Sequence, residues 1–366
     1  METTIRRIGI LTSGGDAPGL NAVIRSVVKT AIIRYGWDVV GIVDGFEGLI
    51  GQPRSRPLGL ADVSGLLPRG GSVLGCTNRG HFKLDGQPDP AALESVFRQA
   101  AASIKRLEID AVIVVGGDGS QRIGHALSLR GMGIVGVPKT IDNDLAGTES
   151  SFGFDTAVAF ATDAIDRLHT TAESHGRVIV VEVMGRDAGW IALYSGIAGG
   201  ADVILIPEIP FSLVKASAKI AARAAEGKRF SIVVAAEGAM PVGGSSLLPN
   251  AGGRIGAAHH VGIGPAVTAE LQQLTGREAR AVVLGHLQRG GSPSASDRLL
   301  ATAYGEAATR AIADGKLGHL VAWRDGRIQL VPITDDVTAA RLVPADHPLI
   351  ETARGLGITF AGAADR

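Results

Sequence analysis

The stretch AVIVVGGDGSQRIGHALSLR, residues 111–130, decides the fold. Its first five residues form an apolar run typical of a buried strand, the glycines open a loop, and SQRIGHALSLR has the apolar spacing of a helix. A second apolar run, GIVGV at 133–137, follows directly. A strand, a loop, a helix and a further strand in this order predict parallel pairing through a right-handed crossover.

The same alternation extends in both directions from this stretch. RRIGILTSGG at 6–15 predicts a strand and a glycine loop, with a helix and the strand DVVGIVDG (38–45) after it. After Asp155 the pattern starts again and continues through the strand FSIVVAAEG (230–238), which predicts a second sheet. We therefore expect an α/β protein with two doubly wound, mainly parallel-sheet domains and an active site in the cleft between them.

Composition agrees with this fold class and excludes several kinds of partner. With 366 residues, 45% apolar and 4% aromatic, the chain suits aliphatic-rich parallel sheets. Its 36 basic and 36 acidic residues balance, so no overall charge draws it to nucleic acid or to an anionic membrane. One cysteine rules out an internal disulfide framework, and we see neither an apolar signal core nor a membrane-length apolar run. We expect a soluble cytoplasmic protein.

Two later segments carry no recognisable chemistry. PVGGSSLLPNAGGRIG at 241–256 is rich in Gly, Ser and Pro and predicts a mobile surface loop, longer than a compact connection requires. The C-terminal tail is less regular, with a hairpin expected at 320–333.

The glycine loop SGGDAPGLN at 13–21 has two equally good interpretations. Successive backbone N–H groups before a helix can hold an anion, and an ordinary tight turn would have the same composition. The loop matches neither GxGxxG nor a Walker sequence, which disfavours a nicotinamide enzyme and a P-loop ATPase.

Acidic residues follow the two apolar runs. Asp118, between two glycines at a strand end, is placed to hold Mg²⁺, with a helix N-cap as the alternative, although Ser120 can serve as that cap. In TIDND, Asp142 and Asp144 share a side if the chain is extended, so one can accept a hydroxyl proton while the other holds geometry or a cation. Solvated loop acids are the commoner case, but the adjacent Thr140 favours catalysis. Phosphoryl transfer is the chemistry these acids indicate.

Basic residues flank two further apolar strands, as a sugar phosphate would require. Any one arginine is more often a surface charge, but five groups around two strands are harder to explain that way. Glu237, after another strand, suits sugar hydroxyls or a salt bridge equally well, and the backbone at Met184 and Gly185 can approach a ring. The basic residues are Arg177, Arg186, Arg280, His286 and Arg289.

Five motifs together resemble the 6-phosphofructokinases, in order and over roughly the first three hundred residues. They are SGGDAPGLN, GGDGS, PKTIDNDL, VVEVMGRDAGW and VLGHLQRGGSP. The resemblance implies that Asp142 accepts the proton of the fructose 6-phosphate 1-hydroxyl, that Thr140 contacts the transferring phosphoryl group or the sugar, and that Asp118 holds Mg²⁺. It also implies direct in-line transfer, in which Arg186 orients the sugar.

The resemblance assigns two binding sites and two domains. The donor site comprises Gly15, Arg79, Gly117, Asp118, Gly119 and Ser120, and the sugar-phosphate site comprises Met184, Gly185, Arg186, Glu237, His286 and Arg289. In the family, Arg177 and Arg280 reach into a neighbouring subunit's site, which implies a homotetramer or dimer. The expected domains are 1–153 with 289–342, for the phosphoryl donor and Mg²⁺, and 154–288 with 343–366, for the sugar phosphate.

Donor choice depends on two residues that point in opposite directions. Family members that use pyrophosphate commonly carry Asp where this chain has Gly119, and Lys where it has Lys139; those that use ATP commonly have Gly at both. An Asp would crowd and repel the ATP α-phosphate, whereas a Lys does not by itself exclude ATP. We therefore expect ATP as the donor, with pyrophosphate as the alternative. The combination resembles the mixed-substrate bacterial subgroup.

Three other functions remain less favoured. Diacylglycerol, sphingosine and NAD kinases share the GGDG loop but lack the MGR and GHLQRGG segments. A regulatory subunit would be expected to have lost Asp118, Asp142 or Arg186, and all three are present. A sugar-binding sensor would not need the two carboxylates.

Overall fold

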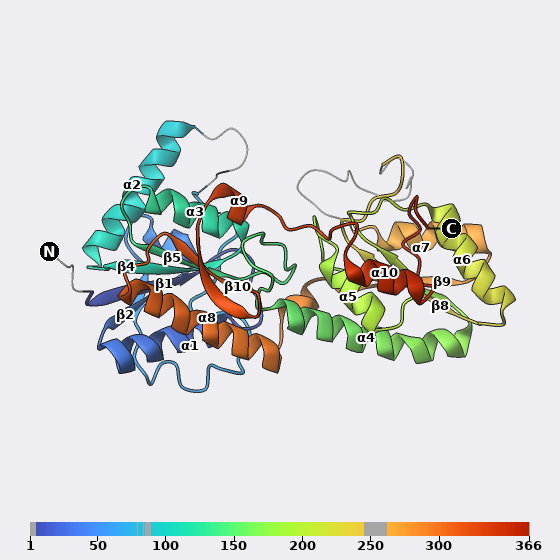
Figure 1. The fold of residues 1–366 in the computed structure, drawn as a ribbon, viewed down its shortest axis with the longest axis horizontal. Helices are drawn as coiled ribbons and strands as arrows, with labels where there is room; N and C mark the ends of the chain where they lie inside the picture. Colours follow the sequence, from blue (N-terminus) through green and yellow to red (C-terminus); the bar gives the residue numbers. More distant parts are fainter. Residues whose placement is uncertain (1–4, 79, 83, 85–88, 245–261, 366) are drawn as a thin grey trace. The chain divides into compact units, whose positions relative to one another are not determined.

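The structure, a computed structural model, describes residues 5–78, 80–82, 84, 89–244 and 262–365. The chain forms two compact units, each built from two stretches of sequence (Figure 1). The first comprises Met1–Thr156 and Arg289–Ala340, and the second comprises Ala157–Gln288 and Arg341–Arg366.

The first unit is built on a seven-stranded sheet in the order β11-β10-β5-β4-β1-β2-β3. Its central pairs are parallel, and antiparallel pairs β2/β3 and β10/β11 close the two edges. The strands are β1 (Arg7–Thr12), β2 (Asp38–Ile42), β3 (Ser55–Pro57), β4 (Ala111–Gly116), β5 (Ile134–Pro138), β10 (His319–Arg324) and β11 (Arg327–Pro332).

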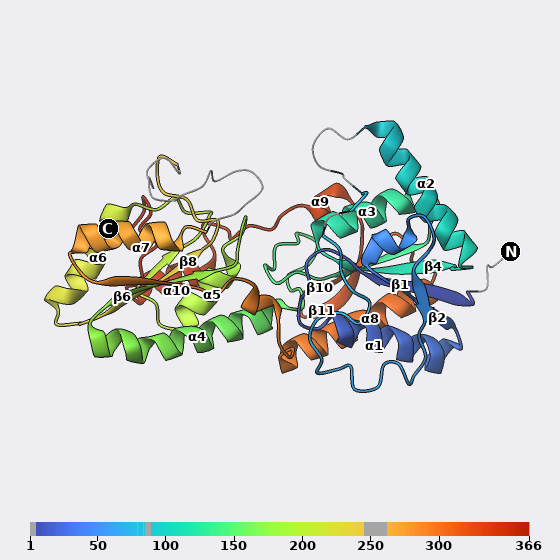
Figure 2. The same cartoon turned by 180° about the vertical axis from the view of Figure 1, so that it is seen from behind.

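Helices cover both faces of this sheet, because its strands are apolar on both sides. In β4, Ile113 and Val115 pack in the core under α1 and α8, whereas Val112 and Val114 pack in the core under α2 and α3. Figure 1 and the view from behind in Figure 2 both show α1 beside α8 on one face and α2 with α3 on the other. The helical segments are α1 (Leu20–Thr30), η1 (Ala31–Tyr35), η2 (Gly45–Leu49), α2 (Pro90–Arg106), α3 (Asp118–Ser128), α8 (Ala295–Ala313) and α9 (Asp335–Thr338).

The second unit has a four-stranded parallel sheet in the order β7-β8-β6-β9. Residues of α6 and α7 pack on Val178, Val180 and Val233 of this sheet. The strands are β6 (Val178–Val183), β7 (Val203–Leu205), β8 (Ser231–Ala236) and β9 (Ala279–Val283). The helical segments are α4 (Phe154–His175), α5 (Trp190–Ala198), α6 (Leu213–Ala225), α7 (Gly264–Thr275), η4 (Gly285–Arg289) and α10 (Pro348–Gly355).

Each sheet contains a point where the strand order reverses. From β1 the chain continues to β2 on one side and later returns to β4 on the other, so the first switch point lies between β1 and β4. From β6 it continues to β7 and β8 and then returns to β9, so the second lies between β6 and β9. Ligands of open α/β sheets bind outside the carboxyl ends of strands at such points.

The mixed α/β class with mainly parallel sheets is confirmed, as is the hairpin, formed by β10 and β11. Two helix starts differ from expectation. The helix read at 101–108 begins at Pro90, because Asp89 caps it by accepting from the Ala91 N–H at 3.0 Å. The helix expected from Ser120 begins at Asp118. Arg79 and most of the 241–256 segment lie outside the described residues.

None of the helices in the described part of the chain combines the length and apolar character that crossing a bilayer requires.

Candidate active site

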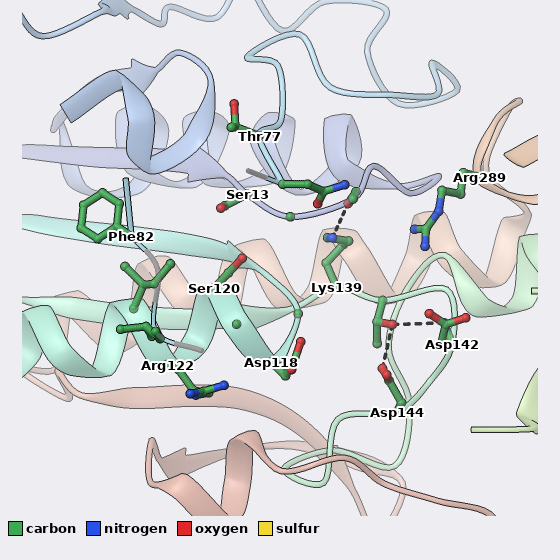
Figure 3. A pocket seen from close by; sticks show the side chains of 18 residues that line it. Ser13, Thr77, Phe82, Asp118, Ser120, Arg122, Lys139, Asp142, Asp144 and Arg289 are labelled. Carbon is green, nitrogen blue, oxygen red and sulfur yellow. Dashed lines mark hydrogen bonds between the residues drawn. The ribbon is translucent and has the colours of Figure 1, made fainter. Parts of the chain in front are cut away.

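Loops from the carboxyl ends of β1, β4 and β5 line one cavity of about 320 Å³ in the first unit (Figure 3). The sheet fixes these loops at their bases: the Ser13 N–H donates to the Val115 carbonyl at 2.9 Å, and the Lys139 N–H donates to the Gly116 carbonyl at 3.1 Å. Of the residues predicted from the sequence, the cavity collects Gly15, Gly117, Asp118, Gly119, Ser120, Lys139, Thr140, Asp142 and Arg289.

Asp118 is the first residue of α3 and therefore lies at the positive end of that helix. The N-cap is Gly117, which has no side chain to satisfy the first N–H groups. Ser120 is buried against Gly116, where an added Cβ would lie 2.3 Å from the Ser120 Cβ, and it does not cap the helix. The start of α3 thus presents its first backbone N–H groups and one carboxylate to the cavity, a combination suited to a phosphate with a bound cation.

Two glycines of the cavity differ in the room around them. A Cβ added to Gly15 would lie 2.8 Å from Arg289 Nη1, whose guanidinium donates to the Asp16 carbonyl at 3.2 Å. A Cβ added to Gly119 would meet no heavy atom within 4 Å. A side chain at Gly15 would therefore displace the Arg289 guanidinium, whereas Gly119 leaves open space that a ligand can use.

Lys139 is buried, with 3% of its surface exposed, although it lines the cavity. Its ammonium donates to the Gly15 carbonyl and so joins the loop after β5 to the loop after β1. Burial lowers the pKa of this ammonium below its ordinary value. The sequence suggested that Lys139 is a cation available to pyrophosphate. In the structure its ammonium also stabilises the glycine loop after β1 through the hydrogen bond to Gly15.

The TIDND loop is not extended. Asn143 has a φ of 50°, so Asp142 and Asp144 do not share a side in the way that an extended chain would give. Thr140 Oγ1 donates to Asp144 Oδ1 at 2.8 Å and accepts from the Asp142 N–H at 3.1 Å. Both carboxylates still line the cavity, but they point in different directions (Figure 3).

One end of the cavity is apolar, and sequence reasoning did not identify it. Phe82 and Arg122 lie on the side of the cavity away from Lys139 and Arg289 (Figure 3). Leu84 and Ile123 also line the cavity, and Ile123 lines a smaller pocket together with Phe82. The Phe82 ring lies 5.4 Å, centroid to centroid, from both Phe46 and Phe97, so it is held by other aromatic rings. Phe82 and Leu84 come from one segment and Arg122 and Ile123 from another, and no local pattern marks the two segments as neighbours.

Gln121 lies under the cavity floor and is fully buried. Its amide nitrogen donates to the carbonyls of Gly116 and Val137 at 3.0 Å each and approaches that of Val114 at 3.3 Å. The side chain thereby joins the carboxyl ends of β4 and β5, the strands that precede Asp118 and Asp142.

In the second unit, part of the predicted sugar-phosphate set lies at the carboxyl ends of β6, β8 and β9. Gly185 has a φ of 135°, and an added Cβ would lie 2.7 Å from the Ala188 carbonyl, so only glycine fits. The Glu237 N–H donates to the Val183 carbonyl at 2.9 Å, which places the start of one loop beside the other. The Arg186 side chain is 67% exposed. Met184 precedes this group, and His286 follows β9.

The remaining two arginines lie at the opposite, amino end of the same strands. Arg177 directly precedes β6, and Arg280 is the second residue of β9, paired with Ile179. Both form ion pairs with Glu278, at 2.8 Å between Arg177 Nε and Glu278 Oε2. The six residues of β6 separate Arg177 from the loop that carries Arg186, roughly 20 Å at about 3.3 Å per residue, and Arg280, level with Ile179, is four strand positions from that loop. The structure therefore does not bring these two arginines to the rest of the set.

Comparison with known proteins agrees with the geometry. Residues 7–312 match the phosphofructokinase family. An ATP-dependent 6-phosphofructokinase of Chloroflexus aggregans is 55% identical over 360 residues, covering 98% of this chain and 99% of the relative. A pyrophosphate–fructose 6-phosphate 1-phosphotransferase of Amycolatopsis methanolica is 48% identical over 345 residues, covering 93% of this chain and 97% of the relative.

Among solved structures, phosphofructokinase from Saccharomyces cerevisiae superposes with a TM-score of 0.77 at 32% identity. The match covers 91% of this chain and 45% of the yeast chain. The sequence resemblance is thus confirmed at the level of the family, by motif, by full-length identity and by fold. The chain belongs to the phosphofructokinase family.

Proposed function

We propose that this chain transfers the terminal phosphoryl group of ATP to the 1-hydroxyl of fructose 6-phosphate, giving fructose 1,6-bisphosphate. One observation carries the proposal: the carboxylates that follow β4 and β5, Asp118 and Asp142, line a single cavity together with two glycine loops. A kinase of this class needs a cation holder and a proton acceptor beside a phosphate cradle, and this cavity contains all three.

In this mechanism Asp142 accepts the proton of the attacking hydroxyl, and Thr140 orients the loop and contacts the transferring group. The backbone N–H groups at the start of α3 stabilise negative charge on the donor. Arg186, Glu237 and the other residues after β6, β8 and β9 bind the sugar phosphate. No covalent phosphoenzyme is needed, because positioning and charge neutralisation supply most of the catalysis.

Mg²⁺ fits the donor side of this cavity. The described residues contain no cluster of three or more His, Cys, Asp or Glu side chains that would enclose a metal. Asp118 alone at a helix start suits a cation that takes one carboxylate, substrate phosphates and water. The ion, when bound with ATP, neutralises phosphate charge, and Asp118 is the residue we expect to hold it.

Two features support ATP over pyrophosphate as the donor. The space at Gly119 is open, and the apolar end formed by Phe82, Leu84 and Ile123 offers a surface for a nucleobase. Pyrophosphate has no apolar part to place there. Lys139, the residue that favoured pyrophosphate, donates one of its three N–H groups to the Gly15 carbonyl, and the 55% identical relative is ATP-dependent.

A shared active site supports self-association. Arg177 and Arg280 lie at the wrong end of their strands to join Arg186, yet the family uses them for the sugar phosphate. We infer that they serve a neighbouring copy of the chain, in a homotetramer or dimer. A cytoplasmic location, where both substrates occur, stays a prediction.

Initial rates with each donor, for the unaltered chain and Gly119→Asp, test the choice of ATP. An aspartate at this position meets no protein atom within 4 Å of its Cβ, so a loss reflects the ligand rather than a clash. At about 4 Å, like charges near a protein surface repel by about 1–4 kcal/mol. We expect activity with ATP to fall by about tenfold to a thousandfold, and activity with pyrophosphate to stay the same or rise.

Gly119→Asn is the matched variant that adds similar bulk without charge, and Gly355→Asp adds the charge at another open glycine, at the end of α10. Both should keep most activity with ATP. Turnover of the unaltered chain with pyrophosphate but not with ATP would overturn the choice of donor.

A further inference from the structure

Asn143 separates the two acids of the TIDND loop and has a left-handed backbone, with φ of 50°. Asparagine is one of the few residues other than glycine that adopt this conformation readily. The conformation turns the chain between Asp142 and Asp144, which is why Asp144 can accept from Thr140 while Asp142 points elsewhere in the cavity (Figure 3). Asn143 itself does not line the cavity.

The Asn143 side chain is turned into the protein, with 5% of the residue exposed. Its Oδ1 accepts from the Ser151 N–H at 3.0 Å, and its Nδ2 donates to the Glu149 carbonyl at 3.3 Å. Ser151 Oγ in turn donates to the Thr140 carbonyl at 2.7 Å. Residues 149–151 are therefore hydrogen-bonded to Thr140 and Asn143, which lie on either side of Asp142 in the sequence.

We propose that Asn143 is the positioning residue for the Asp142 base, through its left-handed backbone and its amide contacts with 149–151. The inference rests on the proposed function, because it assumes that Asp142 accepts the substrate proton. Asn143 contacts neither substrate, and it acts only by fixing where the Asp142 carboxylate lies. Its loss should therefore reduce turnover without weakening substrate binding to a similar degree.

Steady-state kinetics of Asn143→Ala and Asn143→Gly separate the two contributions. Alanine loses both the amide and the preference for the left-handed region, whereas glycine loses only the amide. Since a misplacement of about 1 Å can cost about 100-fold, we expect kcat to fall by about 100-fold in the alanine variant and about tenfold in the glycine variant. KM for fructose 6-phosphate should change by less than about threefold in both.

Asp325→Ala is the matched control, because Asp325 has a φ of 52°, aspartate like asparagine is enriched in this region, and the residue does not line the cavity. It should lower the thermal midpoint, as Asn143→Ala does, and leave kcat unchanged. In the double variant, Asn143→Ala should lower kcat by less than about twofold beyond the loss caused by Asp142→Asn. A residue that acts only by positioning the Asp142 carboxylate has no further effect once that carboxylate is absent.

Near-normal kcat in Asn143→Ala, or multiplicative losses in the double variant, would overturn the proposal. If the alanine variant does not fold, unchanged kcat in Asn143→Gly does the same. Near-normal turnover of Asp142→Asn alone would instead remove the proton-acceptor assignment on which the proposal rests, so the two failures are distinguishable.

Discussion

The two units place functional residues at equivalent points, after the strands that flank a switch point, but they hold them differently. In the first unit the Lys139 ammonium, the Gln121 amide and the Asn143 side chain are buried and tie neighbouring loops together. In the second unit the Arg186 side chain is largely exposed, and Arg280 pairs with Glu278 at the far end of the sheet. The difference is what the proposed function predicts, with a donor site preorganised within one chain and a sugar-phosphate site completed by further ordering or by a second copy.

Removal of the base is the strongest test of the preorganised half. Asp142→Asn should lower kcat by about 10²–10⁴-fold, the usual contribution of general acid–base catalysis, with little change in KM for fructose 6-phosphate. Steady-state rates at saturating substrates measure it. Asp62→Asn, which removes a carboxylate that accepts from the Gly59 N–H outside the cavity, should leave kcat unchanged. Equal losses in the two variants would contradict the assignment.

Subunit mixing tests whether the sugar-phosphate site is shared between two copies of the chain. Arg280→Ala should raise KM for fructose 6-phosphate by about tenfold to a hundredfold, the cost of one charge-assisted contact. If sites are shared between copies, mixed oligomers of Asp142→Asn and Arg280→Ala chains contain some sites with both residues intact. At low fructose 6-phosphate, activity should then exceed the mean of the two separate preparations after they are dissociated and reassembled together. No excess over this mean, with mixed oligomers demonstrated, would place both residues in the same chain's site.

The apolar end of the cavity gives a smaller effect that separates the donors. Phe82→Leu keeps an apolar side chain against Phe46 and Phe97 but removes the flat ring. Stacking of a base on an aromatic ring is worth about 1–3 kcal/mol, so KM for ATP should rise by roughly tenfold. KM for pyrophosphate, measured in the Gly119→Asp background, should not change. A similar rise in KM for both donors would show that the Phe82 ring supports the surrounding loop and does not stack on the nucleobase of ATP.

The buried Glu182 carboxyl in the second unit gives the smallest expected effect, on the pH dependence of stability. Burial raises the pKa of the Glu182 carboxyl in β6, despite the Gly264 N–H that donates to it at 2.6 Å. The folded state therefore holds this proton more tightly than the unfolded state, and stability falls as pH rises from about the ordinary value of 4.5 through the raised pKa. As pH rises through this range, the thermal midpoint of the Glu182→Gln variant should fall less than that of the unaltered chain. Parallel curves for the two proteins would show that Glu182 does not titrate there.

Most elements of the fold could be predicted because their signals are local. The apolar runs at 111–115 and 133–137 became β4 and β5, and the turn chemistry after them placed the glycine loops correctly at strand ends. The start of α2 was missed although Leu93, Val96, Phe97 and Ala100 have helical spacing, and the cap at Asp89 with the proline after it sets the boundary.

The site was only partly predictable because its finer geometry depends on distant contacts. The spacing of apolar residues does not reveal that Asn143 has a left-handed backbone. The extended conformation considered for TIDND was wrong for this reason. Phe82, Leu84 and Ile123 meet only after the sheet has formed. The burial of Lys139 depends on the position of Gly15, which is 124 residues away along the chain. Charge type alone could not reveal that this lysine serves as a brace.

The Gln121 amide has a consequence for how this sequence can change. A Cβ added to Gly136 in β5 would lie 2.2 Å from Gln121 Oε1, so even alanine at 136 would collide with the side chain that secures the two strand ends. Conversely, a residue without donors at 121 would remove one hydrogen bond from the carbonyls of Gly116 and Val137, although Gly116 would keep the bond from the Lys139 N–H. Positions 121 and 136 should therefore mutate as a pair, and a designer who exchanges one must redesign the other.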